Sequence, residues 1–133
     1  MTESILLARI IVADDDENLR NMLDFCLESQ GFEIVGAVCN GKEACQLYES
    51  VQPDAVILDI RMPIMDGITA LKKIRCGDPT AIVIIITGYL EDAYRKQAEA
   101  AGAAGFIEKP FKIETLAGEI NGFLQRSGKF PQA

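Results

Sequence analysis

Apolar and polar residues along this chain follow two patterns, one typical of buried strands and the other of amphipathic helices. Five runs rich in apolar residues predict strands, and the continuous β-branched residues of the first run predict a strand that is buried on both faces. The fourth of these runs is the most hydrophobic, so we expect it to be the central strand. The five runs are Ala8–Ala13, Phe32–Val38, Ala55–Leu58, Ala81–Ile86 and Gly105–Glu108.

Between these runs, apolar residues recur every three or four positions, which is the spacing of a helix with one buried face. Residues that stop helices follow the first four stripes, at Gly31, Pro53, Gly77-Asp78-Pro79 and Gly102. The five stripes are Leu19–Leu27, Ala44–Val51, Ile68–Ile74, Leu90–Ala101 and Ile113–Leu124.

Five successive strand–helix units predict an α/β fold, in which a parallel sheet has helices on both faces and right-handed crossovers. A chain of 133 residues has the length of one domain. We assign residues 5–126 to that domain and residues 127–133 to a C-terminal tail or linker stub.

Polar side chains stand at the ends of four of the predicted strands. The first strand ends at Asp14 and Asp15, the third at Asp59 and the fourth at Thr87, and Lys109 follows the fifth. In an open parallel sheet, the carboxyl ends of the strands lie along one edge, where ligands bind. We therefore expect three carboxylates, a hydroxyl and an ammonium group to converge there.

Three converging carboxylates favour a hard divalent cation. Two unit charges about 4 Å apart repel each other by roughly 4 kcal/mol at an effective dielectric constant of 20. Oxygen ligands with several retained waters suit Mg²⁺. Helix capping explains Asp16 and Glu17, because negative charge is favourable in the first turn of a helix. It does not explain why a second strand also ends on an aspartate.

Four segments together resemble the receiver domain of two-component response regulators, especially the chemotaxis-regulator-like members. The resemblance extends from about Arg9 to Arg126 and rests on IIVADDDENLR, VILDIRMPIMDG, IIITG and GFIEKPF, each at the end of a predicted strand. It implies a doubly wound, flavodoxin-like three-layer sandwich with strand order 2-1-3-4-5, which is the order of this family's chemotaxis member. It also implies a cis peptide bond between Lys109 and Pro110.

The resemblance implies roles for the residues at the strand ends. Asp59 would accept a phosphoryl group, since a carboxylate can act as a nucleophile toward phosphorus. Lys109 would supply a mobile positive charge, and Thr87 a hydroxyl donor. The implied ligands of Mg²⁺ are Asp15, Asp59 and the backbone carbonyl of Arg61, with Asp14 acting through a water.

The resemblance also implies a switch and a path for water. Thr87 and Phe106 resemble the switch pair of the family, which would couple the site to the fourth helix, fifth strand and fifth helix. Core packing is the alternative role for Phe106. Arg61 and Tyr89 would border the opening for hydrolytic water, and because both are large we expect slow self-dephosphorylation. The competing interpretation is that both side chains swing into solvent.

Composition excludes several classes of protein. The net charge is −7 and the 13 basic residues are scattered, so there is no electrostatic footprint for nucleic acid. The small cluster Lys72-Lys73-Arg75 fits the solvated face of a helix. Four cysteines without a C-x-x-C pair, and no histidine, disfavour zinc sites and predict reduced thiols in a cytoplasmic protein. The N-terminus lacks the basic region of a signal peptide, and no stretch approaches the roughly 18 apolar residues of a membrane span.

Other interpretations fit less well. Gly36–Lys42 matches most of a nucleotide-binding loop, but Glu43 stands where Ser or Thr would bind Mg²⁺. A phosphohydrolase acid-x-acid motif lacks its second acid, because residue 61 is arginine. A flavin module would need a glycine-rich phosphate loop where this chain has three aspartates. The main alternative is a degenerate receiver that only mediates protein contacts, although such domains usually lack an acid or the lysine.

The resemblance therefore implies a signalling protein in a phosphorelay, not an enzyme, although it would promote its own phosphorylation and dephosphorylation. Its expected partners are a sensor histidine kinase or phosphotransfer protein and a downstream output domain or target protein. We expect no direct binding to nucleic acid or membrane. A phosphorylation-dependent dimer stays open, as does the choice between a single-domain regulator and part of a longer one.

Overall fold

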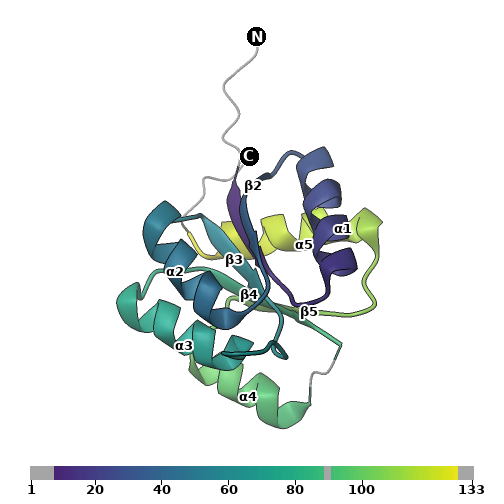
Figure 1. Ribbon diagram of the computed structural model, residues 1–133. Coiled ribbons are helices and arrows are strands. Elements are labelled where there is room, and N and C mark those ends of the chain that lie inside the picture. Colours follow the sequence, from purple (N-terminus) through teal and green to yellow (C-terminus); the bar gives the residue numbers. More distant parts are fainter. Residues whose placement is uncertain (1–7, 89–90, 129–133) are drawn as a thin grey trace.

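A parallel sheet with helices on both faces forms the protein (Figure 1), whose computed structural model describes residues 8–88 and 91–128. The strands are β1 (Arg9–Ala13), β2 (Glu33–Val38), β3 (Ala55–Leu58), β4 (Val83–Thr87) and β5 (Gly105–Glu108). The helices are α1 (Glu17–Ser29), α2 (Gly41–Val51), α3 (Gly67–Gly77), α4 (Asp92–Ala100) and α5 (Ile113–Arg126). The predicted succession of five strand–helix units is confirmed.

The strand order is β2-β1-β3-β4-β5, and every neighbouring pair is parallel, which confirms the predicted topology. The expectation that the most hydrophobic strand is central was wrong by one position. That strand, β4, lies between β3 and β5, and β3 occupies the middle. Both β3 and β4 are buried along their whole length, so hydrophobicity alone does not distinguish their places.

Two apolar clusters fill the spaces on either side of the sheet. Alternate residues of β1 divide between them, with Ile10 and Val12 facing α1 and α5, and Ile11 and Ala13 facing α2, α3 and α4. This division follows from the period of two along a strand. Figure 1 shows the same arrangement, with α1 and α5 on one face and the other three helices on the opposite face.

Most element ends lie close to their predicted positions. β3 and β5 have the predicted bounds, and β1 and β2 each start one residue later than predicted. β4 starts at Val83 instead of Ala81, because the Ala81 N–H donates to the Asp78 carbonyl in a turn. Helix α4 starts at Asp92, and the predicted start at Leu90 lies outside the described residues.

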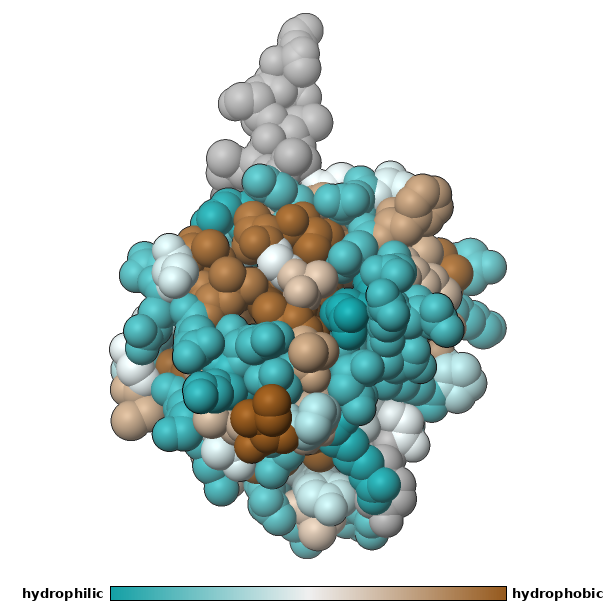
Figure 2. Space-filling model, viewed as in Figure 1, coloured by the Kyte–Doolittle hydropathy of each residue, from teal (hydrophilic) through white to brown (hydrophobic). Residues whose placement is uncertain are grey.

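Strand β2 is an edge of the sheet and is only partly covered. Its residues are half-buried or exposed, and Figure 2 shows apolar surface between α1 and α2, where this strand lies. Pairing with β1 shifts by one residue there, since Ile10 pairs with Ile34 but Ile11 pairs with Gly36. Such a bulge twists an edge strand and hinders its pairing with another chain.

Several exclusions made from the sequence can be compared with the fold. In the part of the chain that the structure describes, no helix is both long and apolar enough to cross a bilayer. All four cysteines are free thiols, and Lys72 and Lys73 are exposed. The string that resembles a nucleotide-binding loop begins inside β2 and ends in α2, where Asn40 caps the helix by accepting from the Glu43 N–H at 2.8 Å. It is a strand joined to a capped helix and not a phosphate-binding loop.

The loop between β3 and α3 contains a strained residue. Ile64 has a φ of 69° and is 78% exposed. Across it, the Met65 N–H donates to the Pro63 carbonyl at 2.6 Å. This bond around a positive φ defines the rare and strained form of the γ-turn, which a β-branched residue seldom adopts.

Replacing Ile64 with glycine is expected to stabilise the protein by about 1 kcal/mol. Backbone strain of this kind amounts to about 1–3 kcal/mol. Glycine removes the strain but adds unfolded-state entropy worth roughly 0.5–1 kcal/mol. Urea unfolding measures the difference. The control is Ile113→Gly, at an exposed isoleucine that lies outside the positive-φ region, and this variant should lose stability. A loss of stability in both variants would contradict the strain argument.

Candidate functional site

Backbone hydrogen bonds fix the chemically important residues at the carboxyl edge of the sheet. The Asp59 N–H donates to the Ala13 carbonyl at 3.0 Å, and the Lys109 N–H donates to the Thr87 carbonyl at 2.9 Å. The Asp14 N–H likewise donates to the carbonyl of Val38, the last residue of β2, at 3.1 Å. Each of these residues therefore continues the sheet by one position, which sets where its side chain begins.

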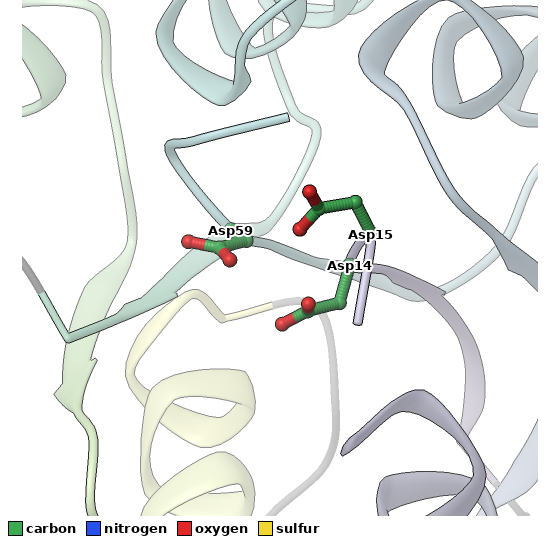
Figure 3. Close-up of side chains that lie close together, drawn as sticks. All are labelled: Asp14, Asp15 and Asp59. Carbon is green, nitrogen blue, oxygen red and sulfur yellow. The ribbon is translucent and has the colours of Figure 1, made fainter. Parts of the chain in front are cut away.

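Three carboxylates converge at this edge, as predicted. Figure 3 shows Asp14 and Asp15 extending from the end of β1 toward the same space as Asp59 from the end of β3. One carboxylate oxygen from each residue lies within 4.8 Å of the other two. Asp14 is fully buried, Asp59 is 6% exposed and Asp15 is exposed, so the acids extend from the interior to the surface.

Lys109 bridges two of the acids. Its Nζ lies 2.9 Å from Asp14 Oδ2 and 3.0 Å from Asp59 Oδ2. Burial disfavours the ammonium group, but the hydrogen bonds to both carboxylates outweigh this effect and raise the pKa of Lys109. The side chain therefore carries its charge between the two acids. The peptide bond between Lys109 and Pro110 is cis, which confirms that prediction.

Asp14 is held at both of its carboxylate oxygens. Oδ1 accepts from the Asp16 N–H at 2.9 Å, and Oδ2 accepts from Lys109 at 2.9 Å. Burial raises the pKa of Asp14, and the hydrogen bonds from Asp16 and Lys109 only partly offset this increase. The negative charge of Asp59 raises the pKa further. The site therefore holds more negative charge than Lys109 alone compensates.

Asp66 and Gly67 shape the loop after Asp59. The Asp66 side chain caps α3 by accepting from the Thr69 N–H at 2.8 Å. The Gly67 N–H donates to the Ile60 carbonyl at 2.8 Å, and a Cβ at Gly67 would collide with the Asp59 carbonyl. Glycine at this position therefore lets α3 begin directly against the backbone of the aspartate.

The two residues of the predicted switch lie on neighbouring strands. Thr87 is the last residue of β4 and is 1% exposed. Phe106 lies on β5 opposite Ile85, where it is half-buried and packs against the core. The Arg95 guanidinium of α4 stacks over the Phe106 ring, 4.7 Å from its centroid. Core packing of Phe106 is confirmed, and its switch role stays a prediction.

Arg61 is exposed in the loop after β3 and borders a groove beside the acids. The groove has a volume of about 560 Å³ and is lined by Asp15 and Lys72 and by Tyr94 of α4. Tyr89, the other residue predicted to shield the site, lies outside the described residues. Restricted water access therefore stays a prediction.

Sequence reasoning missed two arginines near the site. Arg20 of α1 donates from Nη1 to the Asp14 carbonyl at 2.7 Å, and Arg95 covers Phe106. The position of Arg20, in the helix that directly follows the two acids, was the signal that could have indicated its contact. No periodic pattern indicated Arg95, because its partner lies on another element.

The donor set fits Mg²⁺. It consists of carboxylate oxygens from Asp14, Asp15 and Asp59, all within 4.8 Å of one another, and hard oxygen ligands are those that Mg²⁺ prefers. Burial is the main cause of the raised pKa of Asp14, and the charge of Asp59 adds to it. A divalent cation would neutralise that charge.

A doubly wound parallel sheet with an acid cluster and a bridging lysine at its carboxyl edge defines a class of ligand-binding α/β proteins. Residues 10–121 match the family model of the response regulator receiver domain, and the chain belongs to that family. It is a receiver domain of the two-component signalling type.

Individual relatives agree with this assignment. Chemotaxis protein CheY of Thermotoga maritima is 37% identical over 113 residues, which are 85% of this chain and 94% of that protein. Regulatory protein AtoC of Escherichia coli is 40% identical over 119 residues, which are 90% of this chain but 25% of AtoC. A chain of the CheX–CheY–BeF3–Mg²⁺ complex from Borrelia burgdorferi has a TM-score of 0.83 at 32% identity, covering 86% of this chain and 87% of that one.

Proposed function

We propose that this protein accepts a phosphoryl group on Asp59 in the presence of Mg²⁺ and thereby transmits a signal in a phosphorelay. The observation that carries the proposal is the position of Asp59, a nearly buried carboxylate within 3.0 Å of Lys109 and beside two further acids. If Lys109 and its two partner acids served only to stabilise the fold, the site would need neither the exposed Asp15 nor an excess of negative charge.

The chemistry is a transfer between two nucleophiles. An Asp59 carboxylate oxygen forms a bond to phosphorus while the phosphorus–nitrogen bond of a phosphohistidine on the partner breaks, and the departing imidazole takes up a proton. Such transfers depend mostly on positioning and charge neutralisation. Lys109 holds a positive charge beside Asp59, and Thr87 at the end of β4 offers a hydroxyl donor.

Mg²⁺ would neutralise the acids and the incoming phosphoryl oxygens when bound. Asp15, Asp59 and the Arg61 backbone carbonyl would hold it directly, and Asp14 would act through a water. The exposure of Asp15 supports this division, because a surface carboxylate can exchange solvent for an ion more readily than buried Asp14 can. The Borrelia complex, whose name includes BeF3 and Mg²⁺, has the same fold.

We further propose that a sensor histidine kinase or phosphotransfer protein is the donor, and that an output domain or target protein responds. Thr87 and Phe106 would carry the change to α4, β5 and α5, and loss of the phosphoryl group would be slow. A cytoplasmic location fits the free cysteines. Residues 5–126 would form the receiver and residues 127–133 a tail or linker.

Acetyl phosphate tests the proposal without the unidentified kinase. With Mg²⁺ present, intact-mass spectrometry should find a gain of one phosphoryl group, and adding a chelator should prevent it. A protein that stays unlabelled at saturating Mg²⁺ would instead be a degenerate receiver that mediates contacts only.

Asp15→Ala is expected to weaken Mg²⁺ binding by at least about tenfold. Loss of a group that only hydrogen-bonds to a metal ligand already weakens binding by that much, and Asp15 would itself be a ligand. Without metal, the variant should be slightly more stable than the wild type, since one repelling carboxylate is gone. Calorimetric titration and thermal melts measure both effects.

The control is Asp16→Asn, which removes a neighbouring charge but keeps a residue that caps α1 well. It should retain most of the Mg²⁺ affinity. Marked destabilisation of Asp15→Ala without metal would mean that the acid pair is structural.

A further inference from the structure

Arg20 is tied to the backbone of the acid pair. It lies at the start of α1, where its Nη1 donates to the Asp14 carbonyl at 2.7 Å. That carbonyl belongs to the peptide unit that joins Asp14 to Asp15. The plane of this peptide unit sets the direction in which the Asp15 side chain leaves the backbone, so the arginine acts on Asp15 without touching it.

The other hydrogen bonds of Asp14 hold its N–H group and its carboxylate, whereas Arg20 binds its carbonyl. The Asp14 N–H is held by β2 at 3.1 Å, and its carboxylate is held by the Asp16 N–H and Lys109, each at 2.9 Å. The Asp16 bond spans Asp15, which is exposed. The backbone on the other side of Asp15 is the peptide unit that Arg20 binds. The placement of Asp15 opposite Asp59 therefore depends on the carbonyl that Arg20 binds.

A further acidic side chain near the guanidinium comes from α1 itself. Asp24 lies one turn further along the helix, and its buried Oδ1 has no hydrogen-bond partner among the described residues. Burial and the charge of Glu28 raise the pKa of Asp24, while the positive charge of Arg20 lowers it. Residues four apart on a helix are neighbours. Asp24 thus attracts the same side chain that binds the Asp14 carbonyl.

The helix dipole does not account for an arginine at this place. The N-terminal end of a helix carries partial positive charge, so cations are favoured at its C-terminal end. In α1, Asp16 caps the start by accepting from the Asn18 and Leu19 N–H groups, without help from Arg20. A positive charge in the neighbourhood of a metal site also disfavours cation binding.

We propose that Arg20 is a positioning residue of the metal site, which holds the Asp14–Asp15 peptide unit so that the Asp15 carboxylate faces Asp59. This inference rests on the proposed function, because the acids are taken to bind Mg²⁺. It assigns Arg20 no contact with the ion or with the phosphoryl group.

Arg20→Met tests the inference through two measurements. Titration with MgCl₂ in a calorimeter should show affinity weakened by about tenfold, as expected for loss of a contact that orients a ligand. Removal of a positive charge would by itself strengthen cation binding, so weakening identifies positioning. Amide hydrogen exchange without metal should be several-fold faster at Asp16, whose N–H binds Asp14 in the same loop.

Two variants sharpen the result. Arg20→Lys keeps the charge and one donor, and should restore part of the affinity and of the Asp16 protection. Arg75→Met removes another arginine that donates to a backbone carbonyl, that of Ala81 at 3.0 Å, at the opposite edge of the sheet. It should leave the Mg²⁺ affinity unchanged even if stability falls.

Unchanged or tighter Mg²⁺ binding by Arg20→Met, with unchanged exchange at Asp16, would overturn the inference. Failure of the proposed function gives a different result, in which the wild type itself does not bind Mg²⁺. Exchange at Asp16 then still decides whether Arg20 positions the loop.

Discussion

Asp59→Asn is expected to abolish phosphoryl labelling by acetyl phosphate. The amide has nearly the same shape as the carboxylate and can still accept a hydrogen bond from Lys109, which lies 3.0 Å from Asp59 Oδ2. It has no negative charge, however, and is not a nucleophile toward phosphorus. The barrier would rise beyond detection on the time scale of the wild-type reaction, since each 1.4 kcal/mol is about tenfold in rate.

The measurement is intact-mass spectrometry followed by peptide mapping, with brief alkaline treatment to show that the wild-type label is a base-labile acyl phosphate. Asp66→Asn is the matched control. It changes an exposed aspartate seven residues later and keeps a residue that caps α3 well. Label on Asp59→Asn equal to that on the wild type would show that another residue is the acceptor.

The strands and the convergence of the acids could be predicted from sequence because both follow from short-range patterns. A strand that is buried on both faces must be apolar throughout, as β3 is, and parallel strands must end on one edge. These two rules therefore predict that Asp14, Asp59 and Lys109 lie together. Their distances of 2.9 and 3.0 Å show that the expected grouping forms.

Two kinds of feature were not predicted from the sequence. They are contacts of long side chains with another helix or strand, and an unusual backbone conformation. Arg20 crosses from α1 to the Asp14 carbonyl, and Arg95 crosses from α4 to Phe106 on β5. Neither contact repeats with a period that a pattern of apolar residues reveals. The positive φ of Ile64 is similarly hidden, because glycine or asparagine is the usual signal for that conformation.

Lys109→Met is expected to destabilise the metal-free protein by about 3 kcal/mol at pH 7.5. Methionine replaces most of the apolar stem, but the variant leaves Asp14 and Asp59 side by side, fully and nearly fully buried, without a positive partner. Breaking a buried ion pair typically destabilises by about 3–5 kcal/mol. The lower end applies here, because 23% of the Lys109 side chain is exposed to solvent.

The loss should depend on pH in a definite direction. In the wild type, the raised pKa of Lys109 means that its contribution is complete below the ordinary value of 10.5 and is lost only as pH rises through the folded-state pKa. In the variant, Asp14 loses a hydrogen bond and an opposite charge that lower its pKa, which burial already raises above 3.8. An acid with a raised pKa in the folded state favours folding at low pH, and this contribution is lost as pH rises through that pKa. The deficit relative to the wild type should therefore shrink between pH 7.5 and pH 5.

Urea unfolding of both proteins at the two pH values, with and without MgCl₂, measures these effects. Mg²⁺ should stabilise Lys109→Met more than the wild type, because the acids then lack any other positive partner. The control is Lys96→Met, at an exposed position on α4, which should change stability by less than about 0.5 kcal/mol. A deficit of equal size at both pH values would show that the loss comes from packing of the lysine stem and not from the two carboxylates.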